Sequence, residues 1–118
     1  MILVDTSVWI DHFRSSDEKL KSLLISGKVV CHPFVTGEIA CGFLKNRGEI
    51  IGLLQALPQL PVLELDEYLF FIDNNSLTSR GIGFVDINLL ASVKITGNLI
   101  WTRDKRLNEI AAAMNLAV

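Results

Sequence analysis

The sequence predicts an α/β protein, a three-layer α/β/α sandwich around a central, mostly parallel sheet of four or five strands. Short apolar runs alternate with amphipathic segments along the 118 residues, and polar residues that favour a helix start follow most of these runs. Strands that alternate with helices form parallel sheets through right-handed crossovers, with helices on both faces. A chain of this length makes one hydrophobic core, so we expect a single domain over residues 1–118.

The strands are predicted from apolar runs that end abruptly. The first run, residues 1–4, stops at Asp5, and the second stops at Pro33, which cannot donate to a β-ladder. Two later runs have the same character, and the end of the chain is a candidate for a last short strand. The predicted strands are therefore residues 1–4, 29–31, 61–65 and 99–102, with 115–118 as the fifth.

The segments between the strands have apolar residues at helical spacing. Gly27 and Gly97 follow two of them, because glycine readily adopts the left-handed conformation that ends a helix. Residues 74–83 are rich in Asn, Ser, Thr, Arg and Gly and are predicted as a loop. The predicted helices lie around residues 8–13, 20–24, 35–44, 50–57, 66–72, 86–95 and 105–114.

The composition limits where the protein acts. No apolar run is long enough to cross a bilayer, and the first residues lack the basic segment and cleavage site of a signal peptide. We therefore expect a cytoplasmic protein without membrane contact. Cys31 and Cys41 fit neither a CxxC pair nor a zinc spacing, so we expect two free thiols. Half of the residues are hydrophobic, which favours apolar surface covered by a partner.

Acidic residues occur where the predicted strands end. Asp5 directly follows the first strand and Asp104 follows the fourth, while Asp86 begins a helix and Glu38 lies in an otherwise uncharged one. Because parallel strands end at one edge of their sheet, these four carboxylates are expected to converge there. Taken singly, Asp5 is explained equally well as a helix N-cap, and Glu38 as a solvated helix residue.

Four convergent carboxylates without partners would repel one another, so a cation must belong among them. Sites made of carboxylate oxygens suit Mg²⁺ or Mn²⁺, which activate water for phosphodiester hydrolysis. Without these four acids, nine acidic residues face eleven basic ones in the rest of the chain. The candidate contacts to a phosphate backbone are Lys45, Arg47, Arg80, Arg103, Lys105 and Arg106.

Four segments of the chain resemble the PIN-domain family, and more narrowly the VapC-type toxins of prokaryotic type II toxin–antitoxin pairs. They read VDTSVWID, HPFVTGEIA, GIGFVDINLLAS and LIWTRDKRL, in this order, and each contains one of the four acids. The resemblance implies an endoribonuclease dependent on Mg²⁺ or Mn²⁺. Its catalytic and metal-binding residues would be Asp5, Glu38, Asp86 and Asp104.

The same resemblance places Thr6 and Thr102 in support of the acids, and leaves the role of Asn88 open. It also implies a homodimer and a VapB-like antitoxin whose C-terminal segment crosses the active-site groove. The substrate would be RNA. Of the basic residues named above, Arg47, Arg80, Arg103 and Lys105 are the candidate contacts to its backbone, and each taken singly is also explained as ordinary solvated surface.

Other α/β proteins fit the sequence less well. Haloacid-dehalogenase-like phosphatases need a second acid two residues after the first, where this chain has Ser7, and Asp66 is a poor match for the phosphoacceptor of a receiver domain. Metal-free ribonuclease chemistry needs two histidines, but His12 and His32 are better explained as structural or surface residues. A PIN-like module that binds RNA or protein without turnover is expected to lack an acid, and none is missing.

Overall fold

The structure, a computed structural model, describes residues 1–118. Its centre is a parallel sheet of three strands, β1 (Ile2–Val4), β2 (Val29–Val30) and β3 (Leu99–Trp101), in the order β2-β1-β3. Leu3 of β1 pairs with Val30 on one side and with Ile100 on the other. The first strand of the chain is thus the middle strand of the sheet, so its carboxyl end lies between those of β2 and β3.

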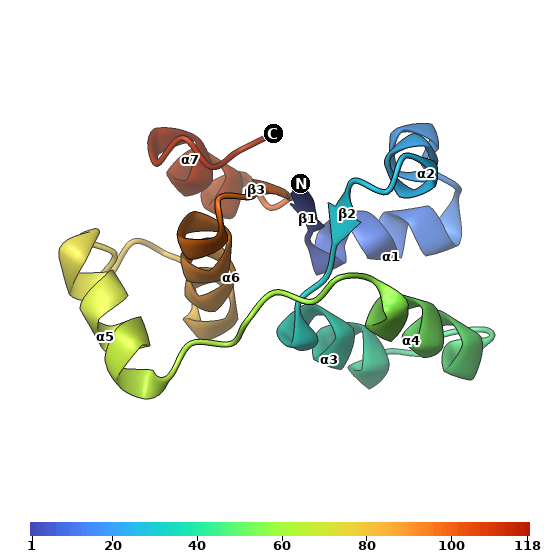
Figure 1. Ribbon diagram of the computed structural model, residues 1–118, viewed down its shortest axis with the longest axis horizontal. Helices are drawn as coiled ribbons and strands as arrows, with labels where there is room; N and C mark the ends of the chain where they lie inside the picture. Colours follow the sequence, from blue (N-terminus) through green and yellow to red (C-terminus); the bar gives the residue numbers. More distant parts are fainter.

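Seven helices surround the sheet. In Figure 1, α1 to α4 lie on one side of the strands and α5 to α7 on the other, as expected for a sheet covered on both sides. None of the helices is long and apolar enough to span a membrane. The helices are α1 (Thr6–Arg14), α2 (Glu18–Ile25), α3 (Pro33–Cys41), α4 (Arg47–Ala56), α5 (Leu65–Asn74), α6 (Phe84–Thr96) and α7 (Lys105–Ala113).

The sheet has three strands, fewer than the four or five predicted. The prediction of a strand at 61–65 is wrong, because these residues form none. Beyond β2 there is only one parallel bridge, between Cys31 and Gln59. The N–H of Leu60 donates to Cys31, and the N–H groups that would extend this pairing in either direction belong to positions 58 and 33, which are both proline, so no ladder forms. The residues that follow enter α5, which begins with a capping box between Glu64 and Glu67.

The end of the chain adds a similar single bridge on the other edge of the sheet. Ala117 pairs with Ile100, whose N–H donates to the carbonyl of Leu116 at 2.8 Å. Both additions lie next to strands of the three-stranded sheet and in parallel orientation. The predicted α/β fold with a parallel sheet is therefore confirmed, but the sheet has three strands and its outer neighbours are reduced to single pairs, so strands and helices do not alternate throughout.

The core joins the sheet to α6. Leu3 and Val4 of β1 are fully buried, and α6 is buried at every position from Ile87 to Val93. A helix buried on all sides belongs to the interior, which explains why its sequence is apolar around its whole circumference. The helix begins at Phe84 rather than at Asp86, because Gly83 takes the N-cap position. Asp86 thus lies in the first turn, just before the buried stretch.

Candidate active site

Asp5 connects β1 to α1, and its carboxylate does not cap the helix. Its backbone occupies the N-cap position, yet its side chain makes no capping hydrogen bond. Oδ2 instead accepts hydrogen bonds from the hydroxyls of Thr102 at 2.7 Å and Ser7 at 2.9 Å. The residue is only 6% exposed. The capping explanation is therefore wrong, and the carboxylate is fixed toward the end of β3.

The turn after β3 is built on the same two hydroxyls. Thr102 Oγ1 accepts a hydrogen bond from the backbone N–H of Asp104, and Ser7 Oγ accepts one from the N–H of Arg103, each at 3.0 Å. Asp104 in turn caps α7, because its Oδ1 accepts the N–H of Leu107 at 2.8 Å. The ends of β1 and β3 are thereby joined through side chains as well as through the sheet.

Glu38 reaches this edge from α3. The helix opens with Pro33 in its first turn, and the ring of His32 caps it by accepting the N–H of Phe34. Glu38 Oε1 accepts a hydrogen bond from the hydroxyl of Thr6 at 2.7 Å. Thr6 directly follows Asp5, so this contact brings the third predicted acid next to the first.

The fourth predicted acid, Asp86, lies in the first turn of α6. Burial raises the pKa of Asp86 to about 6, and the negative charges of Asp5, Asp104 and Glu38 act in the same direction. Carboxylates influence one another in this way only when they are close. Asp86 therefore lies within electrostatic reach of the other three predicted acids.

The four carboxylates lack a basic partner. The ion pairs of the protein join Lys21 to Glu18 and Arg103 to Asp11 and Asp17, so none involves the four acids. No group of three or more His, Cys, Asp and Glu side chains forms a ready-made metal site. Three of the acids, Asp5, Glu38 and Asp104, each commit one oxygen to protein hydrogen bonds, as described above. This arrangement of oxygen donors fits a hard cation that keeps part of its water shell, as Mg²⁺ does.

All four predicted RNA contacts are exposed, and three of them form no ion pair. Lys105 begins α7, directly after Asp104. Arg80 lies on the loop between α5 and α6, where its carbonyl accepts a hydrogen bond from Arg106 at 3.2 Å. Arg47 donates to the carbonyl of Ala40, two residues beyond Glu38, also at 3.2 Å. None of these cations forms an ion pair, so their charges remain available to a polyanion.

Arg103, the fourth predicted RNA contact, has a different setting. Its guanidinium donates to the carboxylates of Asp11 and Asp17. These two carboxylates already balance the charge of Arg103, so a phosphate would have to compete with them.

Sequence reasoning missed Ser7, whose hydroxyl bonds both Asp5 and the turn after β3. The available signal was its position two residues after Asp5 at the start of a helix, which indicated only a cap. Asn88, whose role was open, is buried and donates to the carbonyl of Phe84 one helical turn earlier. It stabilises the start of α6, just where Asp86 is placed.

The two histidines have structural roles. His32 is fully buried, its Nδ1 accepts the N–H of Phe34, and its Nε2 lies 3.2 Å from the hydroxyl of Ser92. Burial lowers the pKa of His32 to about 4. His12 Nδ1 accepts the backbone N–H of Asp17 at 2.9 Å. Neither ring is paired with the other, so metal-free acid–base chemistry by two histidines has no support.

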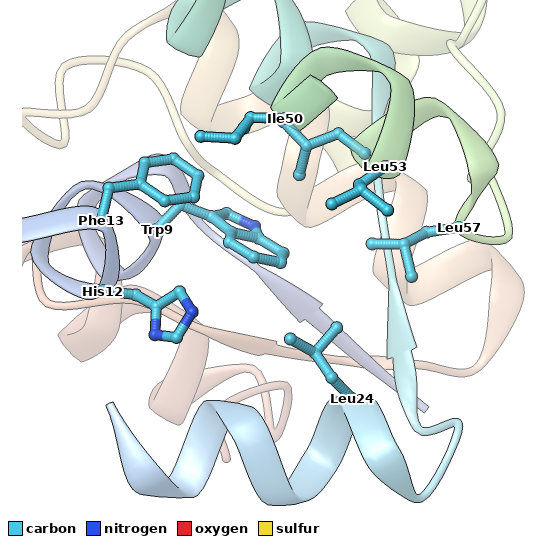
Figure 2. A pocket seen from close by; sticks show the side chains of 8 residues that line it. Trp9, His12, Phe13, Leu24, Ile50, Leu53 and Leu57 are labelled. Carbon is cyan, nitrogen blue, oxygen red and sulfur yellow. The ribbon is translucent and has the colours of Figure 1, made fainter. Parts of the chain in front are cut away.

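An apolar groove lies between α1, α2 and α4. Its volume is about 450 Å³, and Figure 2 shows side chains from the three helices facing it. The indole N–H of Trp9, which lines it, is buried without a hydrogen-bond partner. His12 is the single lining residue that is not hydrophobic. The groove is lined by Trp9, His12, Phe13, Leu24, Ile50, Leu53, Leu54 and Leu57.

Comparison with known proteins agrees with this architecture. Residues 2–113 match the family model described as PIN domain. Two curated relatives from Mycobacterium tuberculosis, of strains CDC 1551 / Oshkosh and ATCC 25618 / H37Rv, are both named Ribonuclease VapC32. Each is 46% identical over 119 residues, which cover 100% of this chain and 96% of the relative. The chain therefore belongs to the PIN-domain family.

Proposed function

We propose that the protein is an endoribonuclease dependent on Mg²⁺ or Mn²⁺, and that it acts in the cytoplasm as the toxin of a type II toxin–antitoxin pair. The observation that carries this proposal is the gathering of four carboxylates without a basic partner, of which Asp86 has a pKa raised to about 6. Such a site is costly to the fold unless a cation binds there. The similarity to two ribonucleases over the whole chain supports RNA as the substrate.

In this proposal Asp5, Glu38, Asp86 and Asp104 hold the cation, directly or through its water ligands. A bound divalent cation supplies a water activated for attack on phosphorus and neutralises charge on the leaving oxygen. The protein contributes the orientation of the acids. Thr102 and Ser7 fix Asp5 Oδ2, which leaves Oδ1 for the cation, and Thr6 similarly engages one oxygen of Glu38.

RNA would approach along exposed cations on two sides of the acids. Arg80, Lys105 and Arg106 lie around the start of α7, and Arg47 lies near Glu38. Each phosphate contact releases counterions, so binding weakens as salt rises. Replacing Arg80 or Lys105 by Ala is expected to raise KM and to reduce the salt dependence of RNA binding by about one ion per charge removed.

The apolar groove suits an apolar helix of the VapB-like antitoxin. Leu53 lies on its wall and is 63% exposed, so the variant Leu53→Glu would place a charge in the groove without disturbing the core. We expect this variant to cut RNA normally and to escape inhibition by the antitoxin. Normal inhibition of Leu53→Glu would place the antitoxin elsewhere.

A homodimer would cover a second apolar surface, formed by α5 and the start of α6. Phe70 is 69% exposed there, and Leu65 and Leu69 of the same helix and Phe84 at the start of α6 are also exposed. We expect Phe70→Glu to convert a dimer to a monomer in light scattering. Phe43→Glu makes the same change on the loop after α3 and should leave the dimer intact, whereas a monomeric wild-type protein would refute the dimer.

The test of the proposed activity uses purified protein stripped of metal with EDTA. Cleavage of a structured RNA is expected to be absent in EDTA and to return with Mn²⁺ or Mg²⁺. Full cleavage in EDTA would refute metal dependence. RNA binding without cleavage at any metal concentration would favour a PIN-like binding module without turnover instead.

A further inference from the structure

The side chain of Arg103 forms ion pairs with Asp11 in α1 and with Asp17, the N-cap of α2. Nη1 donates to Asp11 Oδ2 of α1 at 2.6 Å, and Nη2 donates to Asp17 Oδ2 at 2.5 Å. Asp17 is itself anchored, because its Oδ1 caps α2 by accepting the N–H of Leu20. The guanidinium carbon also lies 5.7 Å from the ring centre of Trp101. Both terminal nitrogens and one face of the guanidinium are therefore occupied by the protein.

The backbone of the same residue is part of the carboxylate site. The Arg103 N–H donates to Ser7 Oγ at 3.0 Å, and that hydroxyl donates to Asp5 Oδ2. The preceding residue, Thr102, is the other donor to Asp5, and the following residue is Asp104. Any shift of Arg103 would move these groups together.

We infer that Arg103 is a positioning residue of the carboxylate site and not a contact to RNA, an inference that rests on the proposed ribonuclease function. Its side chain holds residues 102–104 against α1 and α2, so that Asp104 and the two hydroxyls on Asp5 stay in place. Planar guanidinium with two separate nitrogens suits two carboxylates at once, whereas a lysine ammonium on a flexible stem does not. A displacement of about 1 Å at such a site can lower the rate about 100-fold.

The experiment removes the ion pairs from either side. Arg103→Ala is expected to lower kcat about 10- to 100-fold and to leave KM within about twofold. It should also weaken Mn²⁺ binding about tenfold, measured without RNA by electron paramagnetic resonance. The double variant Asp11→Asn/Asp17→Asn should do the same, since Asn at 17 still caps α2 but neither side chain carries charge. Adding Arg103→Ala to this double variant should change little more. Arg103→Lys should recover only part of the loss.

An Arg103 that contacts RNA predicts the opposite pattern. Freeing its guanidinium through Asp11→Asn/Asp17→Asn would then lower KM, and Arg103→Ala would raise KM while kcat and Mn²⁺ affinity stay unchanged. Either result would overturn the inference. Lys21→Ala, which removes the Lys21–Glu18 ion pair of α2, serves as the matched control and should change none of these quantities.

Misfolding of Arg103→Ala and an inactive wild-type protein can each be distinguished from failure of the positioning role. If Arg103→Ala fails to fold by circular dichroism, the double variant at Asp11 and Asp17 decides between the two patterns. If the wild-type protein cuts no RNA with any metal, the proposed function fails. The Mn²⁺ affinities of wild type and variants then still test the positioning role, and equal affinities would refute it.

Discussion

The hydroxyl of Thr102 donates a 2.7 Å hydrogen bond to Asp5 Oδ2 across 97 positions of the sequence. It ties the end of β3 to the end of β1 and is buried. Thr102→Val keeps the shape of the side chain but removes both this donor and the acceptor for the N–H of Asp104. We expect kcat and Mn²⁺ affinity each to fall about 10- to 100-fold, measured by cleavage assay and metal titration.

Two variants control this prediction. Thr102→Ser keeps the hydroxyl and should retain most of the activity. Thr96→Val removes a hydroxyl that bonds the carbonyl of Ser92 near the end of α6, and should leave kcat unchanged. If Thr102→Val cuts RNA at the wild-type rate, the hydrogen bond does not orient Asp5.

Asp86 destabilises the metal-free protein at neutral pH. Its pKa is raised from 3.8 to about 6, so the folded state keeps a proton that the unfolded chain loses between these values. Stability therefore falls as pH rises from about 4 to 6, and the full cost is present above pH 6. In EDTA at pH 7.5 we expect Asp86→Asn to raise the free energy of unfolding by about 1–2 kcal/mol, after allowance for partial exposure.

The pH dependence provides the check on Asp86. Denaturant unfolding of Asp86→Asn and wild type should give equal stabilities near pH 4, and the difference should open between pH 4 and 6. Glu109→Gln neutralises an exposed acid on α7 and should show no such difference. A destabilised Asp86→Asn protein at pH 7.5 would contradict the electrostatic account.

His32 makes the folded state more stable as pH rises, which is the opposite of the effect of Asp86. Its pKa is lowered from 6.5 to about 4 because the ring is buried, so the unfolded chain takes up a proton first as pH falls. The stability that this neutral ring provides is complete above pH 6.5 and is lost progressively between 6.5 and 4. The loss is best measured by unfolding in the Asp86→Asn background, because the two contributions overlap. If nuclear magnetic resonance shows that the His32 ring titrates near pH 6.5, this contribution of His32 to stability is disproved.

Asp5→Asn is expected to reduce RNA cleavage at least about 1,000-fold while the fold persists. The amide oxygen can still accept from Thr102, but the charge that would attract a cation is gone. Cleavage assays and thermal unfolding of the same preparation separate the two effects. Wild-type cleavage by Asp5→Asn would remove Asp5 from the site.

The sequence was sufficient to predict the central strands and the acids at their ends. Met1 to Val4 form an apolar run that stops at a carboxylate, and this pattern depends only on local chemistry. The segment 61–65 had the same apolar character, yet it forms no strand. The segment meets β2 only at Gln59, beside Pro58, and the capping box of α5 begins at Glu64, so too few residues remain between them to pair.

The site's supporting contacts were less predictable. Thr6 and Thr102 were expected beside the acids through family resemblance, but the partnership of Ser7 with both Asp5 and Arg103 joins residues far apart in the chain. Arg103 illustrates the same difficulty. A basic residue next to an acid resembles a phosphate contact in sequence, whereas its ion pairs with Asp11 and Asp17 appear only once α1, α2 and β3 meet.

The most direct measurement of the central claim is a crystal structure of the protein soaked with Mn²⁺, with anomalous diffraction recorded at the manganese edge. We predict an anomalous peak between Asp5, Glu38, Asp86 and Asp104, which Asp86→Asn weakens. A saturating soak that gives no peak among these four carboxylates, or a peak only elsewhere on the protein, would contradict the assignment of this edge as the catalytic centre.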